Sequence, residues 1–177
     1  RCLLLSSNHA CQDLNRFYPS CRARPHVIPF AVELPDRLLS ASPEAVRQRY
    51  GLPEHFFFLP NQFYVHKNHA LVLSALAHLK KNDREIVVAA SGNPQDPRGT
   101  QTIEYLKKEI LRKNLVANFV FLGSIPYVEV IGLMRSAAAM LNPSLFEGWS
   151  TTVEEAKTLG TPLILSDLAV HREQADG

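Results

Sequence analysis

From residue 56 onward, the sequence alternates short apolar runs with longer amphipathic segments, and this alternation restricts the fold more than any other feature. Five runs of strand length are apolar without alternation: HFFFLPN, EIVVAASG, NFVFLGS, AAMLNPS and TPLILSD. Between them, apolar residues recur at helical spacing over residues 66–81, 99–114, 127–137 and 151–160. Such strands are typical of parallel sheets that are buried on both faces, with helices as crossovers. The sequence therefore predicts an α/β fold with a doubly wound parallel sheet.

The first 51 residues show a different pattern. Residues 2–7 predict one more buried strand, and residues 8–18 predict a helix that Ser7 caps. The segment 24–36 is rich in proline and β-branched residues and predicts an extended linker. Proline at the first helical position and a glycine after the last one then indicate a short helix over residues 43–50. These elements precede the predicted sheet and do not belong to its alternation of strands and helices.

Length and composition limit the class of protein. With 177 residues, the chain has room for one domain, or for one domain and a piece of another. It begins with arginine and ends in HREQADG without a finishing element, so we expect a fragment of a longer protein. A net charge of +2 gives no electrostatic basis for nucleic acid as the main partner. No apolar run approaches the roughly 20 residues that a membrane-spanning helix needs.

The cysteines and the first residues bear on the compartment. Cys2, Cys11 and Cys21 are odd in number and form no C-x-x-C pair. Reduced thiols of a cytosolic protein explain them, and a disulfide between two of them is the alternative. The opening residues also lack the apolar stretch of a secretory signal. We therefore expect a cytoplasmic protein.

One loop carries more polar groups than a plain connection needs. The sequence contains neither G-x-G-x-x-G nor G-x-x-x-x-G-K-[ST], which argues against the usual NAD enzymes and against P-loop NTPases. The loop EGWSTTVEEA instead offers backbone N–H groups from Gly148 to Thr152 and the positive end of a helix. These groups suit a phosphate. Thr151 and Glu154 have the spacing of a capping box, which is the purely structural alternative for those two residues.

Two further carboxylates flank the same helix start. Glu147 precedes it, and Glu155 lies just inside it, where the helical repeat predicts that it points away from the core. Carboxylates accept hydrogen bonds from sugar hydroxyls. A phosphate site between two such groups indicates a nucleotide that carries two sugars.

These residues resemble a known family. The spacing Glu147-x7-Glu155 after a strand, with Gly148 next and AKTLGTPLI following, resembles the E-x7-E motif of the family-four retaining glycosyltransferases of the GT-B architecture, or glycosyl transferases group one. The resemblance runs from about Ser6 to Gln174. It implies a Rossmann-like donor-binding domain, in which Glu147 contacts hydroxyls of the donor sugar and Glu155 holds the ribose.

The stretch LPNQFYVHKNHALVL carries a second part of the resemblance. The family usually has a Gly-Arg pair after the first strand of this domain and a lysine a few residues later, both gripping the diphosphate. Lys67 fits the lysine, whereas Gln62, which follows Asn61, stands at the arginine position. Gln62 can still donate hydrogen bonds to a phosphate, although without charge assistance. The helix dipole disfavours a cation at the helix start where Lys67 lies, and this conflict favours a binding role for it.

Other residues of the two loops complete the candidate set. The donor-binding candidates in the second loop are Gly148, Trp149, Ser150 and Thr151, together with Glu155. Trp149, the only tryptophan, either lines the pocket or packs the loop onto the core. The family often has glycine at the position of Ser150, so the loop can differ in shape.

The histidines do not predict a metal site. His66 and His69 have no cysteine or carboxylate at ligand spacing, so we expect no metal. The segment LSDLAVHREQ resembles the part of the family that follows the next strand, and the resemblance implies that His171 and Glu173 help to shape the donor pocket.

The resemblance also implies a division of the chain and an activity. Residues 1–24 correspond to the end of the N-terminal, acceptor-binding domain, and residues 25–177 to the donor-binding domain without its C-terminal end. The implied reaction moves a hexose, with mannose as the first guess, from a GDP-sugar or UDP-sugar to a hydroxyl of a glycan or lipid-linked acceptor, as in polysaccharide biosynthesis. It retains the anomeric configuration and needs no cofactor or metal. Lys67 and Glu147 are the catalytic candidates, and no residue resembles a covalent nucleophile.

Two other classes of function stay open. A nucleotide-binding module without turnover fits this fragment taken alone, which we expect to be inactive. An epimerase or hydrolase acting on nucleotide sugars would need an added acid–base group near the anomeric carbon, and the loops show none. The missing domain could bring the protein into peripheral contact with the inner face of the membrane.

Overall fold

The computed structural model describes residues 1–95 and 102–175. Its main feature is a five-stranded sheet in the order β5-β4-β3-β6-β7, with every neighbouring pair parallel. The strands are β3 (Phe57–Leu59), β4 (Val88–Ser91), β5 (Phe119–Gly123), β6 (Ala139–Asn142) and β7 (Leu163–Leu165). The chain runs outward from β3 to β5 in one direction and from β6 to β7 in the other. The predicted doubly wound parallel sheet is therefore confirmed, and its switch point lies between β3 and β6.

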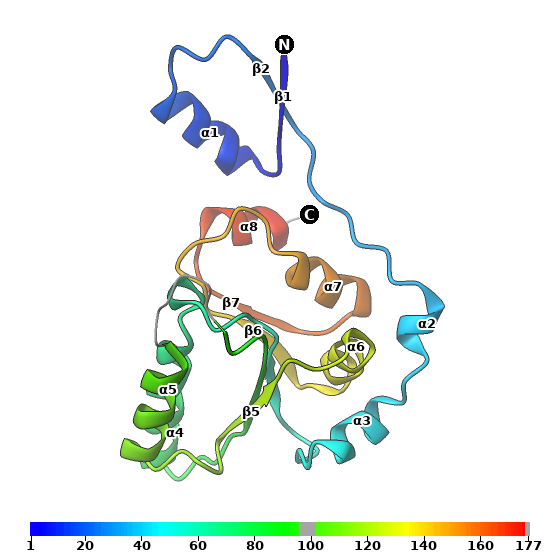
Figure 1. Cartoon of the computed structure of the whole chain (residues 1–177), viewed down its shortest axis with the longest axis vertical. Helices are drawn as coiled ribbons and strands as arrows, with labels where there is room; N and C mark the ends of the chain where they lie inside the picture. The colour runs from blue at the N-terminus through cyan, green and yellow to red at the C-terminus, as the bar shows by residue number, and fades with distance from the viewer. Residues whose placement is uncertain (96–101, 176–177) are drawn as a thin grey trace.

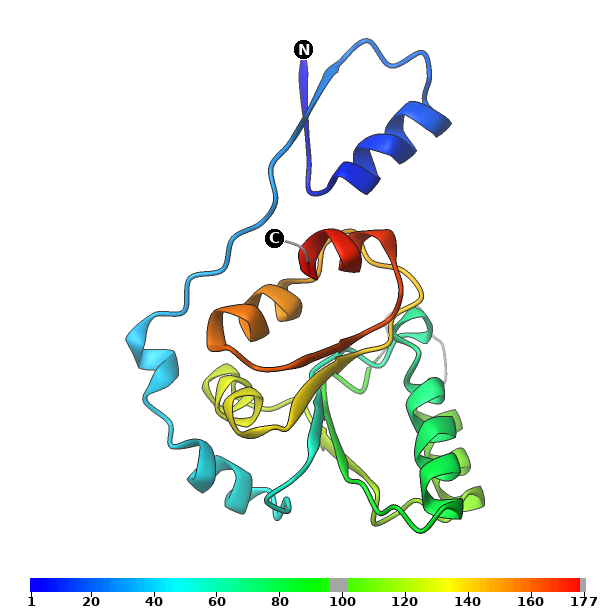
Figure 2. The same cartoon turned by 180° about the vertical axis from the view of Figure 1, so that it is seen from behind.

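Helices cover both faces of this sheet (Figures 1 and 2). On one face, α4 (His69–Lys81) lies beside α5 (Thr102–Arg112). On the other face, α6 (Tyr127–Ser136) contacts both α3 (Pro43–Arg49) and α7 (Thr151–Leu159). The chain then continues through β7 into α8 (Ala169–Ala175). Within the described residues, no helix is both long and apolar enough to cross a bilayer.

The core has two layers because successive strand residues point to opposite faces. Leu59, Val88 and Phe119 pack under α4 and α5. Phe58 and Met140 pack under α3, α6 and α7, and both are fully buried. Burial on both faces explains why the strand sequences show no polar alternation.

The first unit of the chain is a small parallel sheet with one helix. It consists of β1 (Cys2–Leu5), α1 (Asn8–Phe17) and β2 (Arg24–Val27), with Cys2 opposite Arg24 in the register. Ser7 caps α1 as predicted, accepting a hydrogen bond of 3.0 Å from the Ala10 backbone N–H. The cysteines Cys2, Cys11 and Cys21 are free thiols.

Two predictions for this unit are wrong. The segment 24–36 is not a linker throughout, because its first four residues form β2, which pairs with β1 and carries the small sheet beyond residue 24. A short helix, α2 (Asp36–Leu39), follows. Nor is β1 a buried strand, since its residues alternate between exposed and partly buried, and one helix cannot cover both faces of two strands. The division of the chain at residue 24 stays a prediction.

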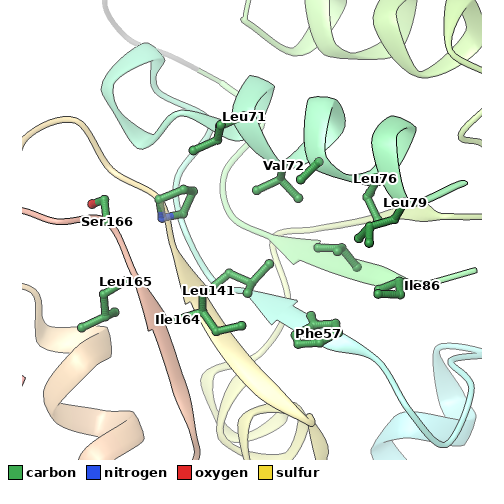
Figure 3. A pocket seen from close by; sticks show the side chains of 13 residues that line it. Phe57, Leu71, Val72, Leu76, Leu79, Ile86, Leu141, Ile164, Leu165 and Ser166 are labelled. Carbon is green, nitrogen blue, oxygen red and sulfur yellow. The ribbon is translucent and has the colours of Figure 1, made fainter. Parts of the chain in front are cut away.

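One part of the large sheet leaves apolar side chains at the surface. A hollow of about 290 Å³ lies between α4 and the strands β3, β6 and β7 (Figure 3). Leu71 and Ile164 on its rim are 52% and 54% exposed. Among the described residues that line it, Ser166 alone is polar, so their side chains offer little to hold a charged or sugar-like ligand.

Candidate functional site

A second hollow, of about 240 Å³, lies at the carboxyl ends of β3 and β6. Doubly wound sheets bind ligands at this switch point. Polar side chains dominate its lining, which consists of Pro60, Asn61, Gln62, Lys67, Glu147, Trp149, Ser150, Thr151 and Thr152. Two loops distant in sequence, one after β3 and one after β6, thus form a single site. Of the catalytic and donor-binding candidates in the two loops and the helix start, Gly148 and Glu155 do not line it.

An ion pair joins the two loops inside this hollow. Lys67, at the end of the 3-10 helix η1 (Val65–Lys67), places its Nζ 2.6 Å from Oε1 of Glu147. The side chains are only 16% and 9% exposed, so both charges are shielded from water and compensate each other. The Leu145 N–H donates to the His66 carbonyl at 2.7 Å, which fixes the backbones of the two loops together. The catalytic candidates predicted from the sequence are therefore direct neighbours.

A buried amide that sequence analysis did not single out contacts residues of both loops that line the hollow. Asn142 ends β6 with no exposed surface and donates from Nδ2 to Ser150 Oγ at 3.0 Å. Its Oδ1 lies 3.4 Å from Asn61 Nδ2 and 2.7 Å from Ser144 Oγ. The same Ser144 hydroxyl lies 2.7 Å from Glu147 Oε1, so it can donate to either acceptor. A polar residue that ends an otherwise apolar buried strand was the signal that could have found Asn142.

The residues after β4 pack against the loop that follows β3. Gly92 approaches the Asn61 backbone so closely that a Cβ atom on it would lie 2.5 Å from the Asn61 carbonyl oxygen. The neighbouring Asn93 N–H donates to Gln62 Oε1 at 2.7 Å. This contact engages the carboxamide oxygen of Gln62, so the amino group is the end that can donate to a ligand.

The predicted capping box at α7 does not form. The N-cap residue is Ser150 rather than Thr151, and no side chain caps the helix there. Glu154 instead accepts a hydrogen bond of 2.8 Å from Gln174 Nε2, because α8 packs beside the start of α7. Gln174 also accepts from the Ser150 N–H at 3.2 Å and donates to the Ser150 carbonyl at 3.0 Å. The Ser150 N–H, one of the donors predicted to be free for phosphate, is therefore already engaged.

Glu155 does not point away from the core as predicted. It is 8% exposed, because α6 packs against α7 at this position, and it accepts a hydrogen bond of 2.7 Å from the Tyr127 hydroxyl. Burial raises the pKa of Glu155, while the hydrogen bond from Tyr127 opposes this effect. Burial and the bond to Glu155 also raise the pKa of Tyr127. The predicted ribose contact of Glu155 stays a prediction.

His69 is a buried residue of the core. His69 is 1% exposed and its ring centroid lies 4.8 Å from that of Phe63. Burial lowers its pKa to about 4, with a smaller contribution from the Lys67 charge, and the Asn61 backbone beside the ring opposes this only in part. Across residues 1–95 and 102–175, no three potential metal ligands gather in one place.

The remaining predicted residues divide between the hollow and its surroundings. Trp149 lines the hollow and its indole Nε1 is buried, so both of its sequence-based interpretations stay predictions. His171 is buried beside Ser166, with Nδ1 2.9 Å from the Ser166 carbonyl oxygen. Glu173 binds the start of α1. Neither His171 nor Glu173 lines the hollow.

Comparison with known proteins identifies a family for this chain. The family model of glycosyl transferases group 1 matches residues 44–176. The putative glycosyltransferase EpsF of Bacillus subtilis (strain 168) is 31% identical over 114 residues, which cover 64% of this chain and 28% of EpsF. The chain thus spans less than a third of the curated relative that it matches.

Solved structures share the fold at lower identity. A glycosyltransferase from Rickettsia africae ESF-5 has a TM-score of 0.80 and 19% identity over 95% of this chain and 45% of its own. Anabaena Alr3699/HepE in complex with UDP has a TM-score of 0.80 and 18% identity, over 97% of this chain and 46% of its own. HepE has also been solved with UDP-glucose. With three quarters of its length matched by the family model, the chain belongs to the glycosyl transferases group 1 family, and its large sheet has the architecture of the GT-B C-terminal domain.

Proposed function

We propose that this chain is the donor-binding part of a retaining glycosyltransferase, which moves a hexose from a nucleoside diphosphate sugar to a hydroxyl of a glycan or lipid-linked acceptor. The buried pair of Lys67 and Glu147 at the switch point carries the proposal. It places one cation for phosphate and one carboxylate for sugar hydroxyls in the same polar hollow. Membership of the glycosyl transferases group 1 family supports this assignment.

Each candidate residue has a role in donor binding. Lys67 transfers its hydrogen bonds from Glu147 to the diphosphate, which frees the Glu147 carboxylate to accept from the donor sugar. The Gln62 amino group and the start of α7 at Thr151 add neutral donors to the phosphates. Asn61 and Gly148 shape the backbone around them, and Glu155 accepts from the ribose in place of Tyr127.

The chemistry depends on the leaving group. As the glycosidic bond to the diphosphate breaks, negative charge develops on the phosphate oxygens. Lys67 is held in position before the reaction and can stabilise this charge without reorganisation. Glu147 orients the sugar so that the acceptor hydroxyl reaches the anomeric carbon.

Two nucleotide sugars are the first candidates for the donor. GDP-mannose is our first candidate, and UDP-glucose is the second because the similar protein HepE has been solved with that ligand. EpsF and HepE do not identify the acceptor, and we expect a polysaccharide intermediate handled at the cytoplasmic side of a membrane.

Nucleotide titration tests the binding part of the proposal. Trp149 is the only tryptophan and lines the hollow, so its fluorescence should change on addition of one of GDP, UDP and ADP, with calorimetry as a second readout. Lys67→Ala and Glu155→Ala should abolish saturation, whereas Lys107→Ala, an exposed lysine on α5, should leave it unchanged. A folded protein that binds no nucleotide in either assay would show that the proposed site is wrong.

Product analysis tests the reaction class. The full-length protein, supplied with GDP-mannose or UDP-glucose and a hydroxyl acceptor, should release the nucleoside diphosphate only as a glycoside forms with retained configuration. Release of free sugar would indicate a hydrolase, and an isomerised sugar an epimerase. Binding without any product would indicate a nucleotide-binding module.

A further inference from the structure

Helix α8 connects the N-terminal unit to the candidate site. Figures 1 and 2 show it between α1 and α7 in both views. The Glu173 carboxylate accepts from the Asn8 N–H at 2.8 and 3.0 Å and from the His9 N–H at 3.3 Å. It also accepts from the Asn8 side-chain amide at 2.8 Å. These contacts join residues more than 160 positions apart in the sequence.

The contact meets a specific need of α1. The first N–H groups of a helix have no partner inside the helix. Ser7 accepts from Ala10, and Glu173 accepts from the two preceding groups, so the first turn of α1 is satisfied by these two residues together. The first turn of α1 contains no acidic residue of its own. Glu173 therefore supplies the negative charge that a helix N-terminus favours.

The next residue in α8 makes the opposite connection. Gln174 is 1% exposed and holds both the N–H and the carbonyl of Ser150, at 3.2 and 3.0 Å. Lys157 Nζ in α7 donates to the Gln174 carbonyl at 2.5 Å, which fixes the backbone of α8 at the same point. Consecutive side chains of one short helix thus hold the N-terminal unit and the N-cap of α7.

A second contact runs in parallel. The Ser6 hydroxyl, at the end of β1, donates to the Gly148 carbonyl at 3.2 Å. Gly148 lies between Glu147 and Trp149, which both line the hollow. The N-terminal unit therefore touches the site loop directly and also holds it through α8.

We propose that Glu173 and Gln174 act as a coupling pair, so that docking of the N-terminal unit sets the conformation of the α7 start at the donor site. Both are positioning residues, because Glu173 holds the start of α1, Gln174 holds Ser150, and neither lines the hollow. Coupling of this kind is reciprocal. Docking of α1 favours nucleotide binding, and bound nucleotide strengthens docking by the same factor. The second half of this statement rests on the proposed function, whereas the structural coupling does not.

Amide hydrogen exchange of the ligand-free chain tests the coupling directly. Glu173→Gln keeps the size of the side chain but removes its charge and one acceptor. We expect faster exchange at Asn8 and His9, and also at Ser150, although Ser150 does not contact Glu173. The reciprocal variant Gln174→Ala should accelerate exchange at Ser150 and also at Asn8 and His9. Glu173→Asp should restore part of the protection.

A matched control separates coupling from loss of charge. Asp167→Asn removes a carboxylate near the same helix, and among the described residues that carboxylate pairs with the exposed Arg172 alone. It should leave exchange at Asn8 and Ser150 unchanged. Faster exchange confined to Asn8 and His9 in Glu173→Gln, with Ser150 as protected as in the unmodified chain, would overturn the coupling. No change at Asn8 would overturn the contact itself.

Nucleotide affinity provides the functional readout. In Glu173→Gln, the dissociation constant for the nucleotide that binds the unmodified chain should rise at least about fivefold, the lower end of typical coupling factors. Asp167→Asn should bind like the unmodified chain. If the unmodified chain binds no nucleotide, the proposed function fails, while the exchange result still decides the coupling. Unchanged affinity together with faster exchange at Ser150 would overturn the link to binding.

Discussion

Lys67 and Glu147 depend on each other for their burial. A buried ion pair adds little stability as a whole, but loss of one partner leaves an uncompensated charge. We expect Lys67→Met to lower the free energy of unfolding by about 3 kcal/mol, and the double variant with Glu147→Gln to recover most of this loss. Urea unfolding of the two single variants and the double variant measures the coupling. If the losses in unfolding free energy of the two single variants add up to the loss of the double variant, the ion pair is not formed in solution.

His69 makes stability depend on pH in a predictable direction. Its pKa of about 4 in the folded protein lies below the ordinary value of 6.5, so the unfolded chain takes up the proton first. The lowered pKa of His69 therefore contributes roughly 3 kcal/mol to the free energy of unfolding. This contribution is complete above pH 6.5 and is lost as the pH falls towards 4. The difference in unfolding free energy between pH 7 and pH 4.5 should be smaller in His69→Leu. Equal differences in both proteins would contradict a buried neutral histidine.

At the scale of elements, the end of β4 positions the first site loop. A Cβ on Gly92 would lie 2.5 Å from the Asn61 carbonyl oxygen and 3.0 Å from Gln62 Cα, and backbone atoms cannot move aside as side chains can. We expect Gly92→Ala to cost about 1–3 kcal/mol in stability and to weaken nucleotide binding, because the Asn61–Gln62 loop must shift. Thermal unfolding and the Trp149 titration measure the two effects.

A matched alanine substitution tests the steric reason. Gly148 also lies in a site loop, but a Cβ added there meets no atom within 4 Å. Gly148→Ala should therefore change stability by less than about 0.5 kcal/mol. A similar loss in both variants would show that the close approach of Gly92 to Asn61 is not the cause.

The elements were predictable from sequence where their signal is local. The strands and helices from Phe57 onward follow apolar periodicity, and Ser7 follows the usual pattern of an N-cap. The E-x7-E spacing and Lys67 also pointed to the hollow at the switch point, which Lys67 and Glu147 line. The errors arise where a distant segment competes. Glu154 was expected to form a capping box with Thr151, but it accepts a hydrogen bond from Gln174 instead. Gln174 lies 20 residues away, so a short stretch of sequence does not reveal this contact.

Burial by distant segments explains the other errors. Glu155 is covered because α6 packs on α7, although its helical phase alone indicates a solvent-facing position. The strand β2 forms because β1 offers an unpaired edge, and the prolines around Arg24–Val27 concealed it. Asn142 was missed for a related reason, since its importance lies in the three partners that the fold brings to it.

At the scale of the whole molecule, the two units differ in the depth of their packing. No residue of α1 is buried, and β1 and β2 alternate between exposed and partly buried positions. By contrast, every residue of β4 is buried. Local opening has a low free energy where few apolar contacts must be broken. Polar contacts of Glu173 and Ser6 connect this N-terminal unit to the rest of the chain.

This difference predicts the order of opening. Backbone amides of β1 and β2 should exchange at least tenfold faster than those of β4, because the small sheet opens without unfolding of the large one. Binding of a nucleotide should slow amide exchange in β1 and β2, because Gly148 and α8 connect the loop after β6 to the N-terminal unit. Hydrogen exchange with and without nucleotide measures both. Equal exchange rates in β1 and β4 would mean that the chain unfolds as one cooperative unit. The N-terminal unit could then not move separately from the site.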